Sequence, residues 1–220
     1  MTRRLAAGTD DSGGGWQVGR ARWTLAIVGG AMAVSLSLAV GACRSRVVQQ
    51  PGIYDAANEA DCLPSVRLTD QHGRVLDLAV LKGKVVLADF IYTSCPGPCE
   101  VMTAQLARVA RHLDGALGSK VEIVSITLDP EHDGPVQMLN FAKTHDAERK
   151  GWLFLSGAPK AVETVMAAFK VERRREPNGM IDHVIEFFLV GPDGRELRQY
   201  SPQQAAPKAV AQDVLRFAAR

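Results

Sequence analysis

Two cysteines lie four positions apart, Cys95 and Cys99, within the stretch TSCPGPCEVM. Thiols at this spacing can form a disulfide, attack a substrate as thiolates, or hold a soft metal ion. An apolar run, VVLADFIY at Val85–Tyr92, precedes them and is typical of a strand that is buried on both faces. Pro98 follows and favours the first turn of a helix. The pattern therefore predicts that Cys95 lies where a buried strand ends and a helix begins.

This junction favours reactive or metal-binding thiols. The unpaired N–H groups and partial positive charge at a helix N-terminus stabilise a thiolate. Residues four apart share one face of a helix, so the sulfurs of Cys95 and Cys99 can converge on one point. Redox-active thioredoxins separate their cysteines by two residues, whereas this chain has three between them, which leaves room for an ion. Both a redox pair and a metal site remain open at this stage.

A third metal ligand would come from the histidines. Two of the five lie too far along predicted helices to join the cysteines, and one belongs to a turn, which leaves His132 and His183. A predicted strand, IEFFLV at Ile185–Val190, follows His183 directly. If that strand lies beside Val85–Tyr92, the loop that carries His183 faces the cysteines. We therefore predict His183 as the third ligand. The five histidines are His72, His112, His132, His145 and His183.

The remaining pattern alternates between strands and helices. Hairpins are predicted over Val66–Leu78 and over residues 185–200. The fold class expected from this order is α/β, a thioredoxin-like fold with an N-terminal β-hairpin extension and a mixed sheet that carries helices on both faces. Further strands are predicted at residues 121–128 and 152–155, and helices at 98–117, 135–145, 160–169 and 207–218.

Composition and charge describe an ordinary globular domain. The chain has 220 residues, of which 46% are hydrophobic and 23% charged, which is enough to bury a core. Lys and Arg total 26 against 24 Asp and Glu, a net charge of +2. That balance gives no reason to expect a polyanionic partner, so no nucleic acid binding is predicted.

The N-terminus has the pattern of a targeting and anchoring segment. Trp23–Ala42 is an uncharged run of 20 residues, the length needed to cross a bilayer core. It ends in VGAC, which resembles a bacterial lipobox and would make Cys43 a lipid anchor; an uncleaved transmembrane helix is the alternative. We expect residues 1–43 to be a signal or membrane anchor, 44–61 a flexible linker and 62–220 the domain. The domain would then face the periplasm or extracytoplasmic side of a bacterial cell membrane, an oxidising compartment.

Three stretches resemble the signature regions of the Sco/SenC family: FIYTSCPGPCEVMTAQL, ITLDPEHDGP and IDHVIEFFLVGPDG. The resemblance runs from about Ser65 to the C-terminus. Members of that family are thioredoxin-fold copper chaperones that assist assembly of the copper A centre of cytochrome c oxidase. The resemblance implies that Cys95, Cys99 and His183 bind copper as Cu(I) or Cu(II), with Asp182 beside the metal. It also implies as partners the copper-bearing oxidase subunit, another periplasmic copper chaperone and a thioredoxin-like reductant.

Several residues fall outside this core motif. Many family members have proline where this chain has Glu100, whose negative charge near the thiolates can favour Cu(II) over Cu(I). Cys62 is an additional thiol that we expect to be a small buried residue. The soft donors Met102 and Met180 are expected to pack near the site. The acids of the second stretch, Asp129 and Asp133, are expected to cap or brace the loop before the second helix.

The sequence is consistent with two functions from different classes. The first is a copper chaperone. The alternative is an enzyme, a membrane-anchored thiol-disulfide reductase that acts on copper-site cysteines through Cys95 and Cys99. The loop GMIDHV lacks the cis-proline that thioredoxin-type enzymes place opposite their cysteines, which argues against a plain oxidoreductase. A purely structural disulfide and a peroxide-removing enzyme are less favoured.

Overall fold

The structure is a computed structural model that describes residues 51–55 and 60–219. The predicted anchor, including Cys43, lies outside these residues. Across the two described ranges, no helix has both the length and the hydrophobicity of a membrane span.

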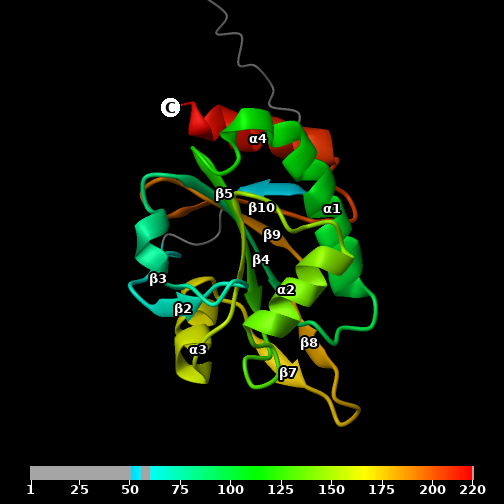
Figure 1. The fold of residues 1–220 in the computed structure, drawn as a ribbon. Helices are drawn as coiled ribbons and strands as arrows, with labels where there is room; N and C mark the ends of the chain where they lie inside the picture. The colour runs from blue at the N-terminus through cyan, green and yellow to red at the C-terminus, as the bar shows by residue number, and fades with distance from the viewer. Residues whose placement is uncertain (1–50, 56–59, 220) are drawn as a thin grey trace, which may run out of the picture. The chain divides into compact units, whose positions relative to one another are not determined.

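A six-stranded mixed sheet forms the centre of the domain, in the order β1-β10-β9-β4-β5-β6 (Figure 1). Strands β4, β5 and β6 are parallel, whereas β9, β10 and β1 run antiparallel to their neighbours. Every residue of β4 is buried, as its nearly continuous apolar run predicts, and every residue of β5 is buried as well, its three polar residues included. The strands are β1 (Ile53–Asp55), β4 (Val85–Ile91), β5 (Val121–Thr127), β6 (Trp152–Leu155), β9 (Phe187–Val190) and β10 (Glu196–Tyr200).

Helices cover both faces of this sheet. Phe90 and Phe154 pair with consecutive residues of β5, so their rings point to opposite faces. Phe90 packs against Phe169 at the end of α3, and Phe154 packs against Phe141 of α2. Figure 1 accordingly shows α3 on one side of β4 and β5, and α1 and α2 on the other. The helices are α1 (Pro98–Leu113), α2 (Pro135–Thr144), α3 (Pro159–Ala168) and α4 (Pro207–Ala218), each with a proline as its first residue.

Two short hairpins stand apart from the main sheet. The first, β2 (Arg67–Thr69) with β3 (Val75–Asp77), is the predicted N-terminal hairpin. The second joins β7 (Arg173–Arg175) to β8 (Ile181–His183) and carries one of the predicted ligands. This second hairpin was not predicted, because three consecutive arginines show none of the apolar alternation that marks a strand. Two short 3₁₀ helices, η1 (Leu78–Leu81) and η2 (Asp114–Ala116), complete the described elements.

The predicted class, a thioredoxin-like α/β fold with a mixed sheet, is confirmed, with two local differences. Helix α1 ends at Leu113, four residues before the predicted end, and η2 follows it. Ile53–Asp55 lie inside the segment expected to be a flexible linker, yet they form the edge strand β1. Ile53 is buried opposite Tyr200 of β10, so backbone pairing orders residues that have too little periodicity of their own.

Candidate metal centre

Cys95 lies on the tight turn between β4 and α1, and Cys99 is the second residue of α1, as predicted. Cys95 is 7% exposed and Cys99 is fully buried. Gly97, between them, has a φ of 119°, a backbone conformation that a residue with a Cβ rarely adopts. The turn brings the Cys99 N–H to the Cys95 Sγ at 3.4 Å. The sulfur of the first cysteine therefore lies at the helix N-terminus, where the second cysteine is within direct reach.

The two thiols have opposite acidities. The Cys99 thiol donates to the Cys95 sulfur and, with the Cys99 N–H and the Tyr92 hydroxyl, lowers the pKa of Cys95 to about 6 against the effect of burial. The same shared hydrogen bond, together with burial, raises the pKa of Cys99. At neutral pH the pair therefore consists of one thiolate, at Cys95, and one thiol. Glu100 opposes the thiolate slightly from the first turn of α1.

His183 has one ring nitrogen with a free lone pair, as its predicted role as a ligand requires. Its Nδ1 lies 2.7 Å from the backbone oxygen of Val184. Because a carbonyl can only accept, Nδ1 carries the hydrogen and Nε2 carries the lone pair. Burial lowers the pKa of His183, which favours the neutral, metal-binding form. The imidazole also packs edge-to-face against the Tyr92 ring, with centroids 6.2 Å apart.

Cys95 and His183 line the same cavity, of about 390 Å³, together with Tyr92 and Asp182. The structure thus places the thiolate and the imidazole on one side of the domain. Within residues 51–55 and 60–219, no three His, Cys, Asp or Glu side chains lie close enough together to hold a metal ion. Cys95 and His183 therefore share a cavity wall, but the three predicted ligands do not form such a cluster among the described residues. Asp182 pairs with Arg174 at 3.5 Å, so Val184, and not Asp182, provides the hydrogen bond that orients the imidazole.

The predicted pairing of the strand after His183 with the strand before Cys95 is confirmed, but His183 itself does not lie where the sequence predicts. Strand β9 pairs with β4 in antiparallel fashion, as the sequence argument required. His183, however, lies at the end of β8 and not in a loop. That location fixes its position through a ladder of backbone pairs, which a loop would not do.

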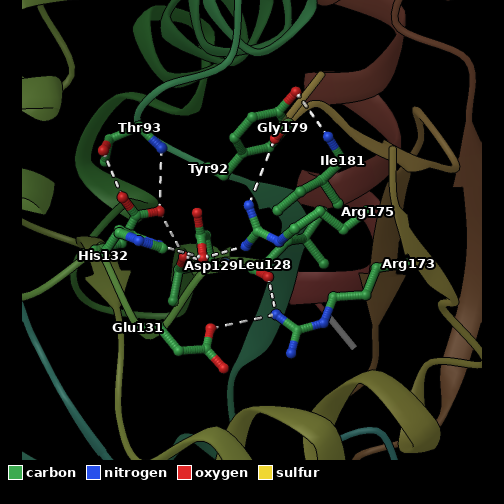
Figure 2. Close-up of polar contacts among 12 residues, drawn as sticks. Tyr92, Thr93, Leu128, Asp129, Glu131, His132, Arg173, Arg175, Gly179 and Ile181 are labelled. Atoms are coloured by element: carbon green, nitrogen blue, oxygen red, sulfur yellow. Dashed lines mark hydrogen bonds and ion pairs between the residues drawn. The ribbon is translucent and has the colours of Figure 1, made fainter. Parts of the chain in front are cut away.

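A polar network joins the cysteine turn to the end of β5 (Figure 2). Asp133 accepts from the Thr93 N–H at 3.0 Å, from the Thr93 hydroxyl, and from the Thr127 hydroxyl at 2.6 Å. Asp129 interacts with His132 Nδ1 at 2.9 Å and with Arg175 Nη2 at 2.6 Å. Both acids brace their loop as expected. They also tie it to two other segments, the turn that carries the cysteines and the hairpin that carries His183.

Three further sulfurs near or outside the site have different environments. Cys62 is fully buried, and burial raises the pKa of its thiol to about 12, as suits an inert core residue. Met102 is also buried and packs in the core as expected. Met180 is 43% exposed and lines the cavity with Cys95 and His183, so it is not a core residue.

Comparisons with known proteins point to one family. Residues 55–219 match the family described as SCO1/SenC. Three solved structures are similar to this chain. BsSco, described as a member of the Sco family of cytochrome c oxidase assembly proteins with a disulfide switch, is 32% identical, with a TM-score of 0.64, and the match covers 76% of this chain and 97% of that one.

Of the other two structures, one contains bound copper and one is described as a lipoprotein. ScoI from Bradyrhizobium japonicum, with copper bound, is 29% identical, with a TM-score of 0.62, and the match covers 69% of this chain and 96% of that one. A SCO1/SenC family lipoprotein from Bacillus anthracis str. Ames is 25% identical, with a TM-score of 0.66, and the match covers 77% of this chain and 98% of that one.

Proposed function

This chain belongs to the SCO1/SenC family, and we propose that it binds copper through Cys95, Cys99 and His183 and delivers it to the copper A centre during assembly of cytochrome c oxidase. Copper is the cargo in this proposal, and the copper-bearing oxidase subunit is the acceptor. The observation that carries the proposal is the shared cavity of Cys95 and His183, with the Cys99 N–H donating a hydrogen bond to the Cys95 sulfur at 3.4 Å.

The donor set fits copper chemically. Two sulfurs and one imidazole nitrogen are soft and intermediate donors, suited to three-coordinate Cu(I), and they tolerate Cu(II) with an added oxygen ligand. Cys95 is already a thiolate near neutral pH, and the Nε2 of His183 already carries its lone pair. Only the Cys99 proton must be displaced when the metal binds, so affinity falls as pH is lowered.

In this proposal, copper binding brings the three side chains closer together. His183 and Cys95 line one cavity without a three-ligand cluster in the described part of the chain. The imidazole must therefore move toward the sulfurs, or the cysteine turn toward the imidazole. A site that closes on its ion and can reopen suits a carrier, because the acceptor can take over the ligands one at a time.

The test is a titration of the reduced full-length protein in detergent, without oxygen, with Cu(I) and Cu(II) against a competing chelator. His183→Ala should weaken binding more than about 100-fold, because even the partners of ligands are worth 10–100-fold. His112→Ala, an exposed histidine at the far end of α1, is the matched control and should bind as the parent does. Equal affinity of parent and His183→Ala would remove His183 from the ligand set.

A thiol-disulfide reductase is the second candidate, and the lowered pKa of Cys95 favours it. In that reaction the Cys95 thiolate attacks an acceptor disulfide and releases one acceptor thiolate. The Cys99 sulfur, after losing its proton, then attacks the mixed disulfide. The products are a Cys95–Cys99 disulfide and a second acceptor thiol, a balanced two-electron transfer. Weak copper binding together with rapid reduction of an acceptor disulfide would favour this function over the chaperone.

We further propose that Cys43 carries the lipid that anchors the domain at the outer face of a bacterial cell membrane. The sequence VGAC and the uncharged segment before it support this proposal, as does the similarity to a family lipoprotein. Intact mass measurement of protein extracted from membranes tests it. A mature chain that begins at Cys43 and carries diacylglycerol is expected, whereas a retained N-terminus would indicate a transmembrane anchor instead.

A further inference from the structure

Two arginines of β7 reach from the hairpin to the end of β5. Arg175 donates from Nη2 to the Asp129 carboxylate at 2.6 Å, and Arg173 donates from Nη1 to the backbone oxygen of Leu128 (Figure 2). Alternate residues of a strand point to the same side, so both arginines extend from one face of β7. The side chain of Asp129 is 3% exposed and that of Arg175 is 46% exposed, so the ion pair is shielded from water on the side of the carboxylate.

These anchors act on the strand that carries the predicted copper ligand. In the β7–β8 ladder, Arg173 lies directly opposite His183, and Arg175 lies directly opposite Ile181. Directly opposite residues of antiparallel strands are held about 4.5–5.5 Å apart at their Cα atoms. Contacts that limit the movement of β7 therefore also limit the movement of His183, which is paired with Arg173. On the other strand, the Ile181 N–H donates to the Tyr92 hydroxyl at 3.3 Å.

We propose that Arg173 and Arg175 are positioning residues for copper binding, which hold the β7–β8 hairpin so that His183 stays within reach of Cys95 and Cys99. This inference rests on the proposed function, because it assumes that His183 is a ligand. Neither arginine lines the cavity that His183 and Cys95 share. Both line a second cavity, together with Glu131, His132 and Ile181.

The physical reason is the low intrinsic stability of the hairpin. Each of its strands has three residues, and the two form a sheet of their own outside the six-stranded sheet. An isolated two-stranded hairpin is marginally stable in water. Without its anchors, His183 would sample many positions, and copper binding would have to order the hairpin as well as close the site. A ligand that is already held close loses less freedom on binding, which raises affinity.

The inference is tested by Arg175→Gln and Arg173→Gln in the reduced full-length protein, in the same competition titration. Each should weaken copper binding about 10-fold, the lower end of what partners of metal ligands contribute. In a His183→Ala background, neither substitution should weaken binding by more than about 2-fold, because an arginine that acts through His183 has nothing left to position. Arg195→Gln, which removes an exposed arginine from another hairpin, is the control and should change neither affinity.

A measurement on the copper-free protein separates positioning from ligand identity. Hydrogen exchange at the Ile181 amide should become faster in both arginine variants and remain unchanged in the control. If His183→Ala binds copper as the parent does, the proposed ligand set fails, while faster exchange in the variants still supports the anchoring. If exchange and affinity in both variants equal those of the parent, or if affinity falls equally with and without His183, the positioning role is refuted.

Arg175→Gln removes a partner of a buried carboxylate and can reduce folding. Arg173→Gln avoids that cost, because it releases a bond to the Leu128 carbonyl and a 4.0 Å ion pair with Glu131, whose side chain is half-exposed. It therefore carries the test alone if the other variant does not fold. Tighter copper binding by Arg173→Gln would also contradict the inference, since it would mean that the anchors hold His183 away from the cysteines.

Discussion

Asp89 of β4 provides the sharpest test of how burial of a carboxyl group affects the stability of this domain. The residue is fully buried, and neither oxygen of its carboxyl group has a hydrogen-bond partner among the described residues. Burial raises the pKa of Asp89 to about 7 from an ordinary value of 3.8, and the nearby Ser125 hydroxyl offsets this only in part. The carboxyl group is therefore neutral in the folded protein at pH values where it is charged in the unfolded chain.

The sign and size of the effect follow from this difference. Between the unfolded and the folded pKa of Asp89, the folded state binds the proton more tightly, so the free energy of unfolding falls as pH rises through that window. At 1.36 kcal/mol per pKa unit, the full difference is roughly 4 kcal/mol. Asp89→Asn removes this titration. The variant should match the parent below about pH 4 and exceed its stability by up to about 4 kcal/mol at about pH 8.

Urea unfolding of the reduced, copper-free protein at these two pH values measures the effect, because all other titrating groups are common to both proteins. Glu163→Gln, at an exposed position of α3, is the control and should follow the pH dependence of the parent. A stability difference between Asp89→Asn and the parent that stays constant from low to high pH would refute the argument. It would mean that Asp89 is hydrated or paired in solution.

Three further predictions concern the cysteine turn. Gly97→Ala should lower the free energy of unfolding by about 1 kcal/mol or more, because Ala is strained at a φ of 119°, and an unchanged urea midpoint would argue against this turn. In the reduced, copper-free protein, iodoacetamide should modify Cys95 before Cys99, with a half-maximal rate near pH 6 by mass spectrometry; equal labelling of both would contradict the assigned acidities. Asp133→Ala should cost about 3 kcal/mol of stability in urea, since it removes the common acceptor of three hydrogen bonds, and a loss under about 1 kcal/mol would show that water replaces it.

Much of the fold around the cysteines can be predicted from the sequence alone, because local residue patterns determine it. The apolar run at Val85–Ile91 predicts a strand buried on both faces, and the run at Val121–Thr127 predicts a second strand; both are strands, and every residue of each is buried. Prolines open all four helices, which places the start of α1 next to Cys95. The i, i+4 spacing of the cysteines then brings the second within reach of the first.

Other strands form only through pairing with a distant segment of the chain, and local sequence patterns do not predict such pairing. Ile53–Asp55 become a strand only because β10 offers an edge, and Arg173–Arg175 only because β8 pairs with them. The hydrogen bond from the imidazole of His183 to the Val184 carbonyl is a further feature that no sequence pattern indicates, whereas the place of Asp182 beside the metal stays a prediction.

By itself, the sequence determined the cysteine turn and the buried strand before it, because periodicity, proline placement and residue spacing act over a few neighbours. It also singled out His183, whose role as a copper ligand stays a prediction. The tertiary structure alone decided that Arg175 meets Asp129, 46 positions earlier in the chain, and that His183 and Cys95 share one cavity. The physical reason is that a salt bridge or a cavity wall depends on two distant segments arriving together. No local pattern encodes that encounter.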